Sequence, residues 1–274
     1  YNITRFIRIM ILKDAISIRQ SVRTFSSAPI EPAVLEELKA YLPTIHGPWG
    51  EPMCRLVLMN RNESDDKPLG TYGVISGAEV YLGVIVANEA PKTLMSAGYV
   101  MEQAILKATT LGLGTCWLGG TFRREQFDQA LEIAEDERIV AVSPVGYAAD
   151  KKRFMERAMR TMVHSDSRKD FDNLFFHDNF ETPYPEDGPL SIAFEAVRFA
   201  PSACNRQPWR LVAAGLGMTH FFAASDPGFQ LVDMGIAMAH FDIARGFLSA
   251  WRILDKIPVT DVPKDLTYIV SAAM

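Results

Sequence analysis

The order of predicted elements repeats along the chain, and this repeat limits the folds that the chain can adopt. In each half a short helix precedes two apolar strands, and a long helix follows the strands. The expected ranges are 31–42, 55–59, 79–87 and 94–111 in the first half, and 191–199, 210–214, 220–224 and 229–248 in the second. The fold class is therefore α+β, with two related α/β halves whose central antiparallel or mixed sheets are flanked by helices.

Individual residues also match between the halves. The matched positions are Glu37 with Glu195, Pro43 with Pro201, Arg55 with Arg210, Gly98 with Gly235, and Met101 with Met238. We interpret the pattern as a diverged duplication, with one half over residues 11–165 and the other over residues 166–274, related by a pseudo-twofold axis. The alternative is a single α+β domain in which the two helices are similar by coincidence.

Three further expectations concern the segments around these units. A short helix is expected over 124–131, followed by a strand over 139–147. The charged, proline-rich stretch 151–189 is interpreted as the connection between the halves. A last strand over 267–272 could join the sheet of the opposite half.

Composition limits the class of protein. The 274 residues are 48% hydrophobic and 22% charged, which fits a globular chain and excludes disorder and a coiled coil. A net charge of -5 argues against a nucleic-acid partner, and no apolar stretch approaches the roughly 20 residues of a membrane-spanning helix. The three cysteines and five histidines show neither CxxC nor HExxH spacing, so we expect no disulfide framework, no metal and a cytoplasmic location.

Residues 19–25 carry two arginines and a serine at alternate positions. In an extended segment, residues two apart point the same way, so Arg19, Ser21 and Arg23 could converge on one anion. Guanidinium groups match phosphate oxygens well, because each can donate two parallel hydrogen bonds. The alternative is that the arginines lie on a solvated surface.

Residues 199–209 form a more distinctive segment, with the sequence FAPSACNRQPW. A proline ends a helix, hydroxyl and amide side chains follow, and Pro208-Trp209 begins a strand. A rigid loop of this kind could hydrogen-bond to a planar heterocycle. The alternative is a helix-to-strand turn that is anchored by a buried Trp209.

The third segment, residues 111–120, is rich in glycine and has the sequence LGLGTCWLGG. It follows a helix and has Trp117 where a dinucleotide-binding motif has its third glycine, so it does not fit that motif. Gly119 and Gly120 could let the backbone approach a flat ligand closely. A helix C-cap followed by a flexible loop is the alternative.

Together these segments resemble the FMN-dependent nitroreductase family. The resemblance covers residues 13–160 and 190–271, and its motifs are Arg19-x-Ser21-x-Arg23, Gly98-Tyr99 with the 112–120 run, Val145-Gly146-Tyr147, and the 200–209 loop. Family members pair as homodimers, and each FMN site takes its phosphate motif from one subunit and its Pro-Ser loop from the other. The resemblance therefore implies FMN as cofactor and NADH or NADPH as electron donor.

This chain departs from the family pattern in a complementary way. The first half has the phosphate motif, but residues 42–49 (LPTIHGPW) stand where the Pro-Ser loop is expected. The second half has the loop, but residues 169–176 (KDFDNLFF) stand where the phosphate motif is expected. One complete site remains, assembled from both halves, and the chain is expected to form a pseudo-dimeric monomer, with further homo-oligomers left open.

By position, the resemblance assigns the cofactor contacts to fourteen residues of this chain. They are Arg19, Gln20, Ser21, Arg23, Leu118, Gly119, Gly120, Lys152, Arg153, Pro201, Ser202, Ala203, Asn205 and Gln207. A basic residue after the Gly-Tyr strand usually joins the phosphate contacts, and which of Lys151, Lys152 and Arg153 does so stays open. Cys204 is interpreted as a small packed residue and not as a redox thiol.

The implied function is an oxidoreductase of the ping-pong type. NADH or NADPH passes hydride to flavin N5, and a small electron-poor acceptor such as a nitroaromatic or a quinone then takes the electrons. Because this chemistry takes place on the flavin, no catalytic side chain is expected. The alternatives are a different flavin reaction (dehalogenation, dehydrogenation or flavin fragmentation) and a flavin-binding or regulatory module without turnover.

Overall fold

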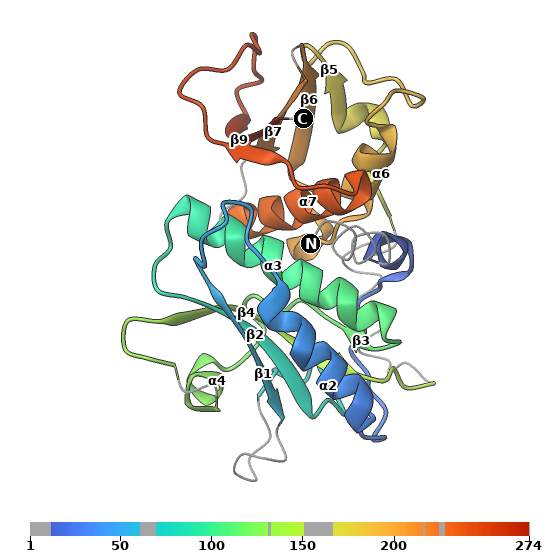
Figure 1. The fold of residues 1–274 in the computed structure, drawn as a ribbon, viewed down its shortest axis with the longest axis vertical. Coiled ribbons are helices and arrows are strands. Elements are labelled where there is room, and N and C mark those ends of the chain that lie inside the picture. The colour runs from blue at the N-terminus through green and yellow to red at the C-terminus, as the bar shows by residue number, and fades with distance from the viewer. Residues whose placement is uncertain are drawn as a thin grey trace.

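Two sheets lie on opposite sides of a pair of central helices (Figure 1). The computed structural model describes residues 12–60, 70–130, 133–150, 167–215, 217–224 and 228–273. The helices of this described part are residues 12–18, α2 (Pro32–Tyr41), α3 (Pro91–Thr110), α4 (Arg124–Ala130), α6 (Ser191–Phe199) and α7 (Gln230–Arg245). Short 3-10 turns occur at η1 (Leu42–Thr44), η3 (Phe171–Asn173) and η4 (Ala203–Asn205).

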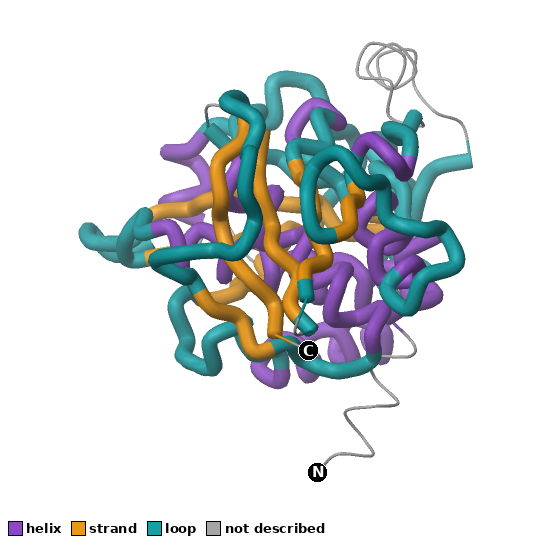
Figure 2. The backbone as a smooth tube through the Cα atoms, turned by 90° about the horizontal axis from the view of Figure 1, so that it is seen from above, coloured by secondary structure: helices purple, strands orange, loops and turns teal. Residues whose placement is uncertain are grey.

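The two sheets share one strand order. The first sheet runs β1-β2-β4-β3, with β1 (Arg55–Asn60), β2 (Val80–Val86), β3 (Gly114–Thr115) and β4 (Arg138–Gly146). The second runs β5-β6-β7-β9-β8, with β5 (Phe175–His177), β6 (Trp209–Ala214), β7 (Met218–Ala224), β8 (Ala250–Arg252) and β9 (Leu266–Ala273). Without β5, the second order repeats the first, and Figure 2 shows the strands of this sheet side by side from above.

The register of the sheets also repeats. The pairing of β2 with β4 shifts between Val84 and Ile85, and the pairing of β7 with β9 shifts between Phe221 and Phe222. Arg55 pairs with Ile85, and Arg210 pairs with Phe222, so the two arginines occupy the same place relative to the irregularity. The single chain therefore resembles a duplicated fold.

The central helices α3 and α7 cross at the matched glycines. A methyl group at Gly98 would overlap the carbonyl oxygen of Val232, and one at Gly235 would overlap the carbonyl oxygen of Met95. The same offset of 137 positions relates both pairs, 98 to 235 and 95 to 232 (235 − 98 = 137; 232 − 95 = 137). Glycine at these two positions lets the backbones of the halves touch, which brings segments of both halves to one site.

The core continues through the helical layer from one sheet to the other. Strand β2 is buried along its whole length because its side chains alternate between two apolar clusters. Leu82 and Val84 face the large cluster that contains α3 and α7, while Tyr81 and Ile85 face a second cluster on the outer side of the sheet. This explains why the sequence of β2 is a continuous apolar run.

One expectation about the second half is wrong, and one is incomplete. The last strand, β9, pairs with β7 and β8 of its own sheet and does not join the opposite half. The α3–α7 layer separates the two sheets, whereas β7 offers β9 a free edge directly beside it. The expected connection also contains a strand that was not predicted, β5, which pairs parallel with β6 and begins in a short apolar run where Leu174 and Phe175 are buried.

The proposed boundary between residues 165 and 166 lies outside the described residues.

The expected helix over 94–111 begins earlier, at Pro91, because proline suits the first turn of a helix. Gly246 ends α7 in the left-handed conformation, with a φ of 77°.

Candidate functional site

Residues 19–25 leave the first helix as an extended segment beside the first sheet. Ser21 bridges to Thr115, and the Val22 amide donates to the Thr115 carbonyl at 2.8 Å. Val22 packs into the outer apolar cluster, while its neighbours Ser21 and Arg23 line a cavity. Alternation along the extended backbone thus separates the core residue from the polar residues.

The guanidinium groups of this segment have unused donors at the cavity. Nε and Nη1 of both Arg19 and Arg23 are buried, and they have no hydrogen-bond partner among the described residues. The Arg19 side chain is only 6% exposed. Because a buried charged donor without a partner is costly, this pair of arginines is suited to receive an anion.

The 200–207 loop faces them from the second half. It begins where α6 ends, and its backbone takes left-handed φ values of 51° at Cys204, 56° at Asn205 and 49° at Gln207. The Gln207 amide donates to Ser202 Oγ at 2.9 Å, and the Lys169 amide donates to Gln207 Oε1 at 2.9 Å. These contacts hold the loop in a conformation that side-chain-bearing residues seldom adopt.

The glycine-rich segment borders the same cavity. Leu118 exchanges two backbone hydrogen bonds with Val142 of β4, at 2.9 and 3.0 Å, which anchors the segment to the sheet. A methyl group at Gly119 would overlap the ring of Phe229, while one at Gly120 would meet no atom of the described residues within 4 Å. Glycine at position 119 therefore permits a close approach to the start of α7, and Gly120 borders open space.

The cavity measures about 460 Å³, which lies within the range of cofactor sites. Ten of the fourteen residues assigned from the sequence line it: Arg19, Ser21, Arg23, Leu118, Gly119, Gly120, Pro201, Ser202, Ala203 and Asn205. Gln20 is exposed and Gln207 is buried within the loop, and neither is among the lining residues. Lys152 and Arg153, like Lys151, lie outside the described residues.

A family model described as "Putative TM nitroreductase" matches residues 11–245. The chain belongs to this nitroreductase family. A crystal structure described as a "putative nitroreductase" from Thermotoga maritima has the same fold, with a TM-score of 0.61 and 19% identity over 95% of this chain and 92% of that one. No curated protein matches the chain.

Two shorter chains of known structure match about half of this chain. A nitroreductase with bound FMN from Desulfitobacterium hafniense is 17% identical, with a TM-score of 0.43 over 52% of this chain and 91% of its own. A structure described as a "putative NADH oxidase" from Clostridium acetobutylicum is 18% identical, with a TM-score of 0.40 over 51% of this chain and 90% of its own.

Two charged residues that line this cavity were not predicted from the sequence. Arg168 lines the cavity, lies over the Phe199 ring, and donates to Asn205 Oδ1 at 3.5 Å. It belongs to the stretch that the sequence presents as a connection, which carried no signal for a site. The cavity therefore has a third guanidinium group in addition to those of Arg19 and Arg23.

The second of these residues is Asp233, in the first turn of α7. Both of its carboxylate oxygens lie 3.1 Å from the Ala203 backbone amide nitrogen, so Asp233 anchors the 200–207 loop to α7. Burial raises the pKa of Asp233 to about 7, while the Ala203 hydrogen bond and the charge of Arg206 act in the opposite direction. In the sequence Asp233 stands inside an apolar helix, and its helical spacing alone gave no sign that it faces a cavity.

A second cavity of about 790 Å³ lies in the first half. Its lining includes Ser96. The offset of 137 positions that relates Gly98 to Gly235 makes Ser96 the counterpart of Asp233 (96 + 137 = 233). Its described lining residues all come from positions 39–58, Ser96 and Val100, so no residue of the second half contributes. Its one arginine, Arg55, is already bound to both oxygens of Glu137, at 2.6 and 2.7 Å.

Among the described residues, no cluster of metal-binding side chains is present, and no helix is long and apolar enough to cross a membrane. All three cysteines are free thiols. Burial raises the pKa of Cys54 to about 12, so this thiol stays protonated. Cys204 is exposed and lines the cavity instead of packing into the core as the sequence suggested.

Proposed function

We propose that this chain is an FMN-dependent oxidoreductase that uses NADH or NADPH to reduce small electron-poor acceptors such as nitroaromatics and quinones. The observation that carries the proposal is the position of the unused Arg19 and Arg23 donors in a cavity that is closed on its other side by the 200–207 loop. Two cations with buried hydrogen-bond donors that are unpaired among the described residues, beside a cavity of cofactor size, fit a phosphate-bearing cofactor.

The residues divide the binding of FMN between the two halves. Arg19, Ser21 and Arg23 would hold the phosphate, with help from Lys152 or Arg153 as the family resemblance implies. Ser202 and Asn205 would border the ring and the ribityl chain, and the backbone at Leu118–Gly120 would follow the ring edge. The apolar side chains of Val232 and Ile236 would exclude water from one wall. When bound, FMN supplies the two-electron chemistry that links the nicotinamide to the acceptor.

The proposal includes one FMN per chain. The second cavity has no free guanidinium pair among its described lining residues, because Arg55 is bound by Glu137 and no arginine of the second half lines it. We also keep the two-half division of the chain, the origin of the halves in a duplication and the cytoplasmic location as proposals. The three free cysteines fit a reducing compartment.

The proposal is tested by purifying the protein with FMN and adding NADH or NADPH without oxygen. The visible flavin absorbance should disappear quickly with at least one nicotinamide and return when a quinone or a nitroaromatic is added. If FMN binds but neither nicotinamide bleaches it, the proposed reductase activity is contradicted, and the protein is better described as a flavin-binding module. If FMN does not bind, the whole proposal fails.

A further inference from the structure

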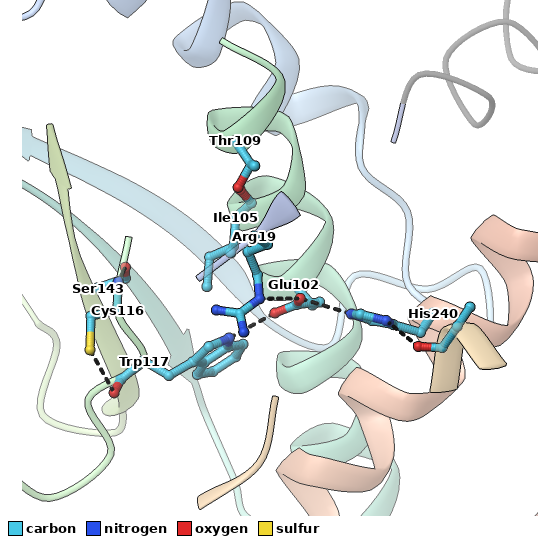
Figure 3. A network of polar contacts seen from close by, with 9 residues as sticks. Arg19, Glu102, Ile105, Thr109, Cys116, Trp117, Ser143 and His240 are labelled. Carbon is cyan, nitrogen blue, oxygen red and sulfur yellow. Dashed lines mark hydrogen bonds and ion pairs between the residues drawn. The ribbon is translucent and has the colours of Figure 1, made fainter. Parts of the chain in front are cut away.

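A buried carboxylate, Glu102 of α3, connects the cavity to the second half (Figure 3). Glu102 is fully buried. Its Oε2 accepts a hydrogen bond from Trp117 Nε1 at 2.7 Å, and its Oε1 lies 2.9 Å from His240 Nε2 and 4.0 Å from Arg19 Nε. Arg19 and Trp117 both line the cavity, whereas His240 lies on α7 and does not line it.

The contacts of His240 determine where its protons are. Nδ1 lies 2.8 Å from the carbonyl oxygen of Ala196, which can only accept a hydrogen bond, so Nδ1 carries a hydrogen. Nε2 faces the Glu102 carboxylate, another acceptor. A neutral imidazole would place two lone pairs against each other there, so one further proton lies between Nε2 and Oε1. The Glu102–His240 pair is therefore neutral overall.

This neutrality bears directly on Arg19. A buried carboxylate with no other cation beside it would draw in the Arg19 guanidinium and cancel its charge. Here the carboxylate makes its close contacts with His240 and Trp117, and Arg19 stays at 4.0 Å without a hydrogen bond to it. Arg19 thus keeps both its charge and its donors.

We propose that Glu102 and His240 are positioning residues of the anion site: Glu102 fixes Trp117 and the reach of Arg19, and His240 of the second half neutralises Glu102 so that Arg19 can bind a phosphate monoester. The inference rests on the proposed function, because that function supplies the phosphate of FMN. It assigns the second half a role beyond the 200–207 loop. It also explains why two ionisable residues occupy the buried contact between α3 and α7.

The first experiment measures the dissociation constant of FMN for apoprotein by quenching of flavin fluorescence, with riboflavin as a probe that lacks the phosphate. His240→Leu should weaken FMN binding at least about tenfold, because it leaves a buried charge that only Arg19 can neutralise. Riboflavin binding should change much less. The matched control is Glu37→Gln on α2. It removes a surface carboxylate that pairs at 2.5 Å with Lys107, which lies on α3 as Glu102 does. It should leave both constants unchanged.

The double variant separates this role from simple packing. Glu102→Gln removes the charge that His240 neutralises, so adding it to His240→Leu should recover part of the lost FMN affinity. A purely structural role predicts that the double variant is at least as weak as His240→Leu. That result, or normal FMN affinity in His240→Leu, would overturn the inference.

A measurement on the wild-type protein needs no variant to fold. Nitrogen-15 NMR of the His240 ring should show a hydrogen on Nδ1 and a hydrogen bond between Nε2 and the Glu102 carboxyl, and a ring without that Nε2 hydrogen bond would overturn the inference. This test does not depend on FMN. Failure of wild-type protein to bind FMN would therefore count against the proposed function, whereas the absence of a hydrogen bond between His240 Nε2 and Glu102 would count against the Glu102–His240 pair.

Discussion

At the scale of single residues, the site depends on a backbone conformation of the 200–207 loop that could not be predicted from the sequence. Cys204, Asn205 and Gln207 adopt left-handed φ values although none of them is glycine. Each such residue costs about 1–3 kcal/mol, so the surrounding contacts must hold the loop. Two of these contacts come from the side chains of Ser202 and Asp233, which also line the cavity.

The arginines were easier to predict than the loop. Alternation in an extended segment places Arg19 and Arg23 together, and this pattern is local. Asp233 and Arg168 reach the cavity only through packing between the halves, and no periodicity in the sequence carries that information. Glu102 and His240 are hidden for the same reason, since each stands within an apolar helix and meets the other across 138 positions.

The raised pKa of Asp233 predicts how stability depends on pH in the ligand-free protein. Between about pH 4 and pH 7 the folded protein keeps a proton that the unfolded chain has released, so stability falls as pH rises through this range. Asp233→Asn keeps an acceptor for the Ala203 amide but cannot ionise. The variant should therefore gain stability over the wild type by roughly 2 kcal/mol between pH 5 and pH 8.

Urea unfolding at several pH values measures this difference. Asp255→Asn, at an exposed position, is the matched control for loss of a carboxylate. If the difference in free energy of unfolding between Asp233→Asn and the wild type does not change with pH, Asp233 does not have a pKa raised by burial.

At the scale of elements, the predicted helices and strands match the structure where an apolar pattern is long. The expected ranges of α6 and β6 agree closely with the observed ones, because helical spacing and alternation are local signals. The short strands β5 and β8 have three residues each, too few for a periodic pattern to show. The partner of β9 was mispredicted, because strand pairing depends on the position of the helical layer and not on the strand's own sequence.

The crossing of α3 and α7 predicts a specific effect of one methyl group. In an ordinary helix Gly→Ala stabilises by about 1 kcal/mol, but at Gly98 the added methyl would overlap the Val232 carbonyl, and the backbones would have to separate. We expect Gly98→Ala to lower the free energy of unfolding by about 3 kcal/mol or more.

Thermal unfolding with a matched variant tests this expectation. Gly215→Ala adds a methyl group at a position where no atom of the described residues lies within 4 Å and φ is not left-handed, so it should change stability by less than about 0.5 kcal/mol. A Gly98→Ala protein as stable as the wild type would mean that the helices do not touch at this glycine.

At the scale of the whole molecule, the two halves share one architecture but contribute differently to the site. The strand orders and the register irregularities repeat, as the matched residues in the sequence suggested. The polar residues do not repeat: the 460 Å³ cavity combines arginines of the first half with the loop of the second, and the 790 Å³ cavity is lined by described residues of the first half alone. Without this asymmetry, a duplicated fold would carry two equivalent sites.

The number of FMN molecules bound per chain tests this account most directly. Titration of FMN into apoprotein of known concentration should reach saturation at one per chain. In the same titration Arg23→Ala should weaken binding at least about tenfold, and Arg138→Ala, which breaks an exposed pair with Glu89, should not. Saturation near one with this pattern is the predicted result; saturation near two, or no binding at all, would contradict a single site assembled from both halves.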